Sequence, residues 1–130
     1  MFTIHVTTPL FEWGPGLDRP NGTDHPDTLN ARNRLAMRYL AAGQPAKAIP
    51  LYKMTLSECE RVLGPNNSNT LRSRNNLAMA YRAAGQPAKA IPLFERTLAD
   101  SERVLGASHP DTKAVRANLA ALTGEPEPTE

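Results

Sequence analysis

The fold is decided by residues 35–52, LAMRYLAAGQPAKAIPLY, because residues 77–94 repeat them as LAMAYRAAGQPAKAIPLF. The repeat distance is 42 residues, and it extends beyond this block, since Arg61-Val62-Leu63-Gly64 returns as Arg103-Val104-Leu105-Gly106. The tetrapeptide HPDT at residues 25–28 returns two periods later at residues 109–112. Self-similarity at a period of this size predicts stacked supersecondary units rather than a single irregular core.

Each unit carries the signals of two helices joined by a tight turn. Apolar residues from Leu35 to Leu40 follow helical spacing, and Gly43 supplies a left-handed residue that ends the first helix. Pro45 suits the first position of a second helix, which we expect to run to Gly64. The sequence therefore predicts two antiparallel helices in each unit.

The starts of the first helices are expected at three equivalent positions. Asp27, Asn69 and Asp111 share one register, and each side chain can accept a hydrogen bond from a free amide of the helix that follows it. The third of these helices is expected to run from Asp111 to about Leu122 without a second helix after it.

Composition agrees with an all-α fold and excludes several classes of protein. The chain has 130 residues, of which 40% are hydrophobic and only 5% aromatic, as suits closely packed helices. No stretch approaches the roughly 20 apolar residues of a membrane span. Cys59 is the single cysteine, so no internal disulfide can form, and a reducing cytoplasmic location is expected.

These residues carry a family resemblance. The pattern Asn75-Asn76-Leu77-Ala78, then Tyr81, Gly85, Ala90 and Phe94, resembles the tetratricopeptide repeat in its long 42-residue form, similar to the repeats of kinesin light chains and of actinobacterial signalling proteins. The resemblance covers about residues 25–122. It departs from the family's pattern at the loop of residues 67–70 and at Ala117, which replaces the first asparagine of the pair.

The resemblance implies an all-α superhelix, or solenoid, of five helices arranged as two and a half helix-turn-helix repeats. The repeats are expected over residues 25–66 and 67–108, with a half-repeat over residues 109–122. Residues 1–24 match nothing in the family and are expected to form an irregular arm. Residues 123–130 are acidic and proline-rich, which predicts a disordered tail.

The resemblance also implies a protein-protein interaction module of the bacterial cytoplasm. In this family the first helices line a concave groove that holds an extended peptide or a partner helix. Carried over to this chain, the groove positions are Asn30, Asn33, Arg34, Met37, Arg72, Asn75, Asn76, Met79, Arg82 and Asn118. Asparagine amides can pair with the backbone of a peptide whatever its sequence, and methionines add a pliable apolar floor.

The distribution of charge indicates an acidic partner. Residues 25–122 hold fourteen Lys and Arg against seven Asp and Glu, while the rest of the chain holds one basic residue against six acidic ones. A basic groove would attract an acidic peptide. Arg32, Arg74 and Arg116 recur in one register, and for these three we favour salt bridges to second-helix acids over contact with a partner. Because two and a half units bury little area, self-association through the exposed ends of the solenoid is also expected.

Catalysis, cofactors and metals are not indicated. His5, His25 and His109 are dispersed, and Cys59 lies on the apolar stripe of its helix. A G-x-x-x-x-G-K-[ST] loop is absent from the sequence, so the chain holds no such nucleotide-binding site. Two alternatives stay open: a nucleic-acid-binding helical solenoid, which the net charge of +2 disfavours, and a regulatory fragment of a larger repeat-containing signalling NTPase.

Overall fold

The computed structural model describes residues 26–124. The predicted arm, residues 1–24, lies outside this range, as do residues 125–130 of the predicted tail. The described residues form five helices and no strand. They are α1 (Pro26–Ala41), α2 (Pro45–Leu63), α3 (Ser68–Ala83), α4 (Pro87–Val104) and α5 (Pro110–Thr123). The predicted all-α superhelix of five helices is confirmed.

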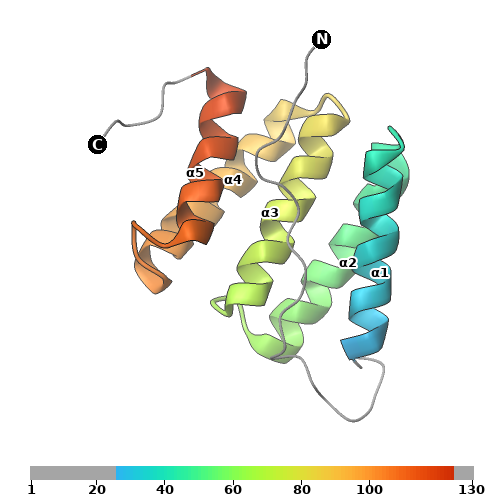
Figure 1. Cartoon of the computed structure of the whole chain (residues 1–130), viewed down its shortest axis with the longest axis horizontal. Coiled ribbons are helices and arrows are strands. Elements are labelled where there is room, and N and C mark those ends of the chain that lie inside the picture. Colours follow the sequence, from blue (N-terminus) through green and yellow to red (C-terminus); the bar gives the residue numbers. More distant parts are fainter. Residues whose placement is uncertain (1–25, 125–130) are drawn as a thin grey trace.

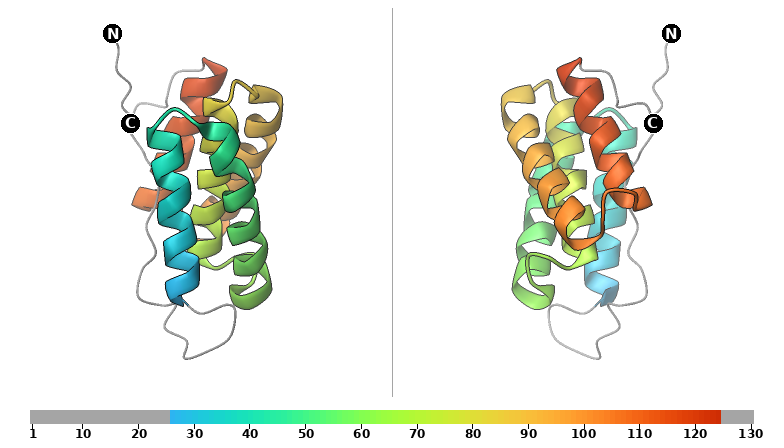
Figure 2. Two further views of the ribbon diagram at one scale, coloured as in Figure 1. Left: turned by 90° about the vertical axis from the view of Figure 1, so that its right-hand side faces the viewer. Right: turned by 90° about the vertical axis from the view of Figure 1, so that its left-hand side faces the viewer.

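The helices form two layers. Figure 1 shows α1, α3 and α5 side by side in front, with α2 and α4 behind them, and the side views of Figure 2 separate the same two layers. Each second helix packs against the first helix of its own unit and against the first helix of the next. The stack therefore continues without a break from α1 to α5.

Two kinds of glycine turn alternate along the chain. Gly43 and Gly85 sit between the helices of a unit with φ of +79° and +74°, and Gly64 and Gly106 follow the second helices with φ of +91° and +100°. L-residues rarely adopt this left-handed backbone, so glycine is required at these four positions. The predicted stop at Gly43 and start at Pro45 are both observed.

The predicted helix caps were wrong by two residues. Asn67, not Asn69, caps α3, because its side chain accepts the amide hydrogen of Asn69 at 2.8 Å. His109, not Asp111, caps α5 in the same way, with 3.0 Å from the Asp111 nitrogen to Nδ1. Asp27 is likewise inside α1 rather than before it. The residues predicted to be caps therefore lie in the first turns of their helices.

The core consists of two apolar clusters, one at each junction between units. The first joins Ala36, Ala48, Tyr52, Leu77 and Ala80, and the second joins Ala78, Ala90, Phe94 and Val115. Small alanines let the helices approach closely, while Tyr52 and Phe94 occupy the same repeat position and are both fully buried. Neither unit holds a core of its own, because each cluster draws on both neighbours.

Leu35 and Leu77 show how strongly a neighbouring unit changes one repeat position. Leu77 is 5% exposed because α2 covers it, whereas the equivalent Leu35 on α1 is 43% exposed. The two leucines have the same residue type and the same place on a first helix. Their difference in exposure therefore shows how much burial one junction between units adds at this position.

We expect Leu77→Ala to lower the free energy of unfolding by about 3 kcal/mol, since it leaves a cavity in the first cluster. Leu35→Ala, the matched control, should cost less than about 1 kcal/mol because the side chain is already in water. Urea denaturation followed by circular dichroism measures both values. Equal losses of unfolding free energy for the two variants would contradict the conclusion that packing between units buries the core.

Candidate partner-binding face

The layer of α1, α3 and α5 presents the face on which the sequence places partner contacts, and four of its asparagines are buried. Asn33, Asn75, Asn76 and Asn118 are at most 3% exposed. Asn76 donates from Nδ2 to Oδ1 of Asn33 at 3.3 Å, and Asn118 donates in the same way to Asn75 at 3.1 Å. Each bond links the second asparagine of one unit to the first asparagine of the unit before it.

This asparagine ladder holds neighbouring first helices in register. A buried amide that loses its partner costs more than the bond itself contributes, so each pair fixes how one first helix slides along the next. The ladder stops at Arg34, which takes the second-asparagine position in α1, and at Ala117, which takes the first in α5. Nδ2 of Asn75 is buried and has no hydrogen-bond partner among the described residues.

The other predicted face residues differ in exposure. Arg34 is exposed, and Met37, Met79 and Arg82 are half-buried. Sδ of Met37 accepts a long hydrogen bond of 3.5 Å from Asn33. The side chain of Asn30 lies outside the described residues. The accessible part of the face therefore consists of arginine and methionine side chains. The asparagine amides are buried.

Arg72 contributes to the stack itself. Its Nε donates to Oδ2 of Asp111 at 2.9 Å, and the two side chains are only 28% and 13% exposed. This ion pair ties α3 to the start of α5. No sequence pattern predicts this ion pair, because the two residues are 39 positions apart and the equivalent pair one unit earlier is Asn30 with Asn69.

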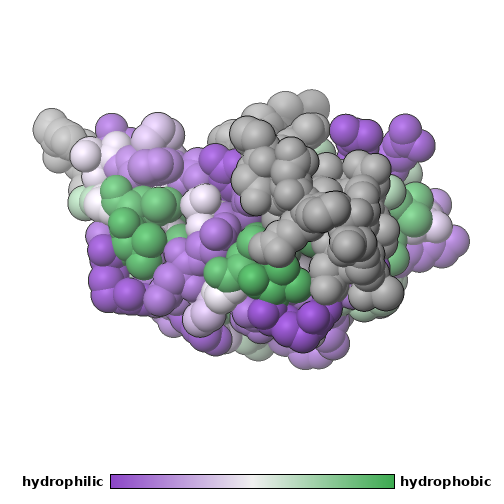
Figure 3. Space-filling view, turned by 90° about the horizontal axis from the view of Figure 1, so that it is seen from below, coloured by the Kyte–Doolittle hydropathy of each residue, from purple (hydrophilic) through white to green (hydrophobic). Residues whose placement is uncertain are grey.

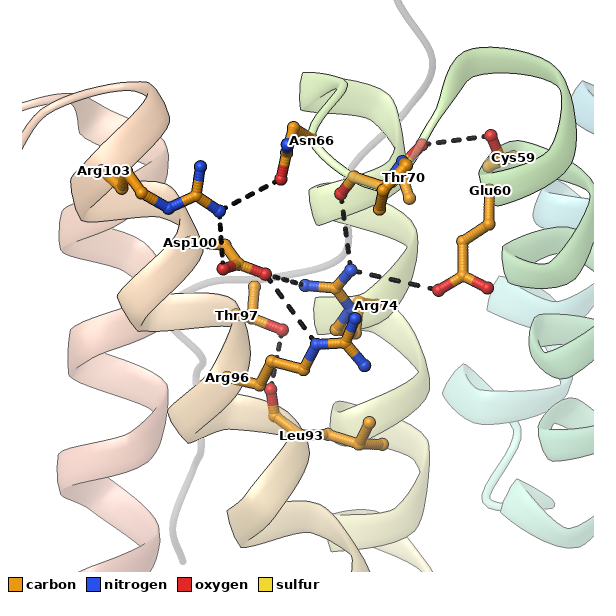
Figure 4. A network of polar contacts seen from close by, with 11 residues as sticks. Cys59, Glu60, Asn66, Thr70, Arg74, Leu93, Arg96, Thr97, Asp100 and Arg103 are labelled. Carbon is orange, nitrogen blue, oxygen red and sulfur yellow. Dashed lines mark hydrogen bonds and ion pairs between the residues drawn. The ribbon is translucent and has the colours of Figure 1, made fainter.

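The repeated arginines make internal salt bridges, as predicted. Arg32 donates to Glu58 at 2.8 Å, and Arg116 donates to Glu102 at 3.2 Å. Arg74 is the most buried, at 1% exposed, and donates to Asp100 at 3.0 Å with Glu60 at 3.9 Å on its other side (Figure 4). These guanidinium groups therefore pair with acids of the second helices and do not belong to the accessible part of the face.

The network around Arg74 shifts two pKa values. Burial lowers the pKa of the Arg74 guanidinium, and the nearby charge of Arg96 lowers it further, while Asp100 acts in the opposite direction. Burial also acts to raise the pKa of Asp100, but hydrogen bonds from Arg103 and Arg74 outweigh it, so the carboxyl pKa is lowered. The pair therefore stays ionised at neutral pH, and Asp100 accepts hydrogen bonds from both Arg74 and Arg103.

Groups that could act chemically lie apart or inside the core. Cys59 is fully buried, and burial together with the charge of Glu58 raises its thiol pKa to about 12. Such a thiol is not a nucleophile at neutral pH. Among residues 26–124, no three His, Cys, Asp or Glu side chains come close enough to hold a metal ion.

The surface is mostly polar. Seen from the side at which α3 and α5 begin, hydrophobic patches are separate and lie among hydrophilic residues (Figure 3). The large exposed apolar side chains Leu35, Met54 and Val104 come from three different helices. Isolated apolar residues of this kind are usual on protein surfaces. In the part of the chain that the structure describes, no helix is long and apolar enough to cross a membrane.

This arrangement defines a helical-repeat scaffold with an open face of first helices. Comparison with known proteins agrees: the Tetratricopeptide repeat family matches residues 28–69 and 70–111. The chain belongs to the tetratricopeptide repeat family. Repeats of this family generally mediate protein-protein interaction.

A solved structure extends the likeness to the three-dimensional level. The crystal structure of a Podosopora anserina putative kinesin light chain with nearly identical TPR-like repeats matches with a TM-score of 0.70 and 31% sequence identity. The match covers 77% of this chain and 47% of that one, so this chain spans about half of that protein. No curated protein matches significantly.

We expect Asp100→Asn to lower the free energy of unfolding at pH 7 by about 3 kcal/mol, because it leaves a buried guanidinium without its main partner. Glu58→Gln breaks the equivalent pair of the first unit, where Arg32 is 14% exposed, and should cost about 1 kcal/mol or less. Urea titrations at several pH values measure both. A cost for Glu58→Gln as large as that for Asp100→Asn would contradict the conclusion that the deeper burial of Arg74 makes its ion pair the more important one.

The pH dependence of the Asp100 contribution follows from its lowered pKa. The carboxylate stabilises the fold above its unfolded pKa of about 3.9, and this contribution is lost as the pH falls through the lower native value. The difference between wild type and Asp100→Asn should therefore shrink below pH 4.

The asparagine ladder predicts coupling between two positions. Asn118→Ala should cost about 1 to 2 kcal/mol, since it leaves Oδ1 of Asn75 buried without its donor. Asn75→Ala combined with Asn118→Ala should cost less than the sum of the single changes. A double-mutant cycle by chemical denaturation measures the coupling, and strictly additive costs would show that the bond contributes nothing.

Proposed function

We propose that the face of α1, α3 and α5 binds an extended acidic peptide, or an acidic segment of a partner protein, without catalysis. The observation that carries this proposal is the division of the arginines. Arg32, Arg74 and Arg116 are paired with acids of the second helices, and Arg72 is paired with Asp111. Arg34 and Arg82, at face positions, take part in none of the ion pairs of the described residues.

The spacing of the face residues supports an elongated ligand. Arg34 and Met37 lie on α1, and Met79 and Arg82 lie one unit further along on α3. The cationic groups would attract carboxylates from a distance, and the thioethers would cover apolar side chains of varied shape. A segment that crosses both helices would contact all four side chains.

The buried asparagines support the same proposal through the scaffold. They keep α1, α3 and α5 in register, which fixes the distance between the two basic positions.

The remaining expectations stay predictions. A cytoplasmic location and self-association through the ends of the solenoid are compatible with the free cysteine and with the exposed Leu35. Membership of the tetratricopeptide repeat family supports protein binding over nucleic-acid binding, because that alternative has only the basic charge of the repeats in its favour.

The proposal can be tested with a partner protein that has been isolated by its binding to the wild-type chain. Arg34→Glu and Arg82→Glu should each weaken its binding about tenfold, since each replaces an attraction by a repulsion. Lys53→Glu is the matched control, because Lys53 is exposed on α2 in the other layer and the change in net charge is the same. Calorimetric titration at low salt gives the affinities.

Raising the salt concentration adds a second readout. The affinity of wild type should fall towards that of the face variants as screening shortens the reach of the charges from about 10 Å at 0.1 M to about 3 Å at 1 M. If Lys53→Glu weakened binding as much as the face variants, the proposed face would be wrong.

A further inference from the structure

One side of α1 is uncovered, although the same side of α3 is buried. Helix α1 lies at the end of the row of first helices (Figure 1). On α3, the four residues that face the preceding unit are at most 5% exposed: Ser73, Asn76, Leu77 and Ala80. One period earlier on α1, four residues are all exposed and form what we call the outer stripe: Ala31, Arg34, Leu35 and Arg38.

Two residues of the outer stripe differ from those of α3 in charge and size. Arg34 stands where α3 has Asn76, and Arg38 stands where α3 has Ala80. Ala80 is fully buried in the cluster that contains Tyr52, which leaves no room for an arginine. The outer stripe is therefore unsuited to a preceding unit that packs as α2 packs on α3.

The two guanidinium groups of the outer stripe are available to a ligand. Neither Arg34 nor Arg38 takes part in an ion pair among the described residues. They are four residues apart on one helix, so about 6 Å separates their Cβ atoms, and Leu35 lies beside them. Two carboxylates one helical turn apart, next to an apolar side chain, would complement this surface in charge and in hydrophobicity.

We propose that the outer stripe binds an amphipathic helix of a partner protein, with two acids one turn apart opposite Arg34 and Arg38 and an apolar residue over Leu35. A helix satisfies its own backbone hydrogen bonds, and the outer stripe has no asparagine to pair with an extended backbone. On α3, the equivalent side is also covered by a helix, α2. This surface goes beyond the peptide-binding face proposed above, and only Arg34 borders both.

A second copy of this chain is the competing occupant, and its charges suit the outer stripe less well. Of the acidic side chains that the structure describes, only Glu95 makes no ion pair within the described residues. A single carboxylate cannot match two arginines. The acids therefore favour a different protein as the partner.

Fluorescence anisotropy with the full chain and a designed probe tests the inference. The probe is a fluorescein-labelled helical peptide of about five turns, with a leucine stripe and two glutamates one turn apart. Arg38→Glu should weaken its binding at least tenfold and Leu35→Ala about threefold. Lys53→Glu is the matched control, because it makes the same change in net charge on α2 and should leave the affinity unchanged. Absence of binding to wild type would overturn the proposal.

A charge-reversed probe provides an independent test. A peptide with lysines in place of the two glutamates should bind the double variant Arg34→Glu, Arg38→Glu at least tenfold more tightly than it binds wild type. Equal affinities would overturn the proposal.

Arg82→Glu separates this surface from the peptide-binding face. It should leave the affinity for the glutamate probe unchanged, because Arg82 lies on α3 outside the outer stripe. A probe that Arg82→Glu releases would lie on the face instead, which would overturn this inference and leave the proposed function intact. A wild-type dimer in sedimentation equilibrium that Arg38→Glu dissociates would also overturn it, since a second copy would then cover the outer stripe.

Discussion

The structure depends on the packing of each second helix between two first helices, because no single helix pair among residues 26–124 encloses a core. Tyr52 and Phe94 are fully buried only because α3 and α5 close over α2 and α4. Stability in such an array is the sum of small units and the interfaces between them. The exposed Leu35 shows the same helix position without that cover.

Polar groups at the junctions then decide how the layers align. Apolar clusters of alanine and leucine tolerate sliding, but a guanidinium that is 1% exposed must meet its acceptors in one geometry. Arg74 meets acids on both α2 and α4, so it ties together three helices from two units. The asparagine ladder does the same between first helices. The alignment of α1, α3 and α5 is therefore a consequence of these polar contacts between helices.

The chain is a helical-repeat scaffold of the tetratricopeptide repeat family. In a scaffold of this kind, residues of one type fall into two groups by position along the helix. Arginines at the register of Arg74 turn towards the second layer, and Arg34, two residues after Arg32, is exposed. Two positions change the direction of a helical side chain by more than half a turn. One sequence can thus be basic throughout and still present only a few charges to a partner.

Most of the fold could be predicted from the sequence, because the same helix and turn signals occur in both repeats. The 42-residue period, the glycine turns and the helix count needed no tertiary information. The true caps at Asn67 and His109, the pair of Arg72 with Asp111 and the burial of the four asparagines did not follow from it. Those depend on distances between units, which a periodic pattern does not encode. The sequence by itself determined which helices form, and the tertiary structure decided which polar side chains join units and which stay exposed.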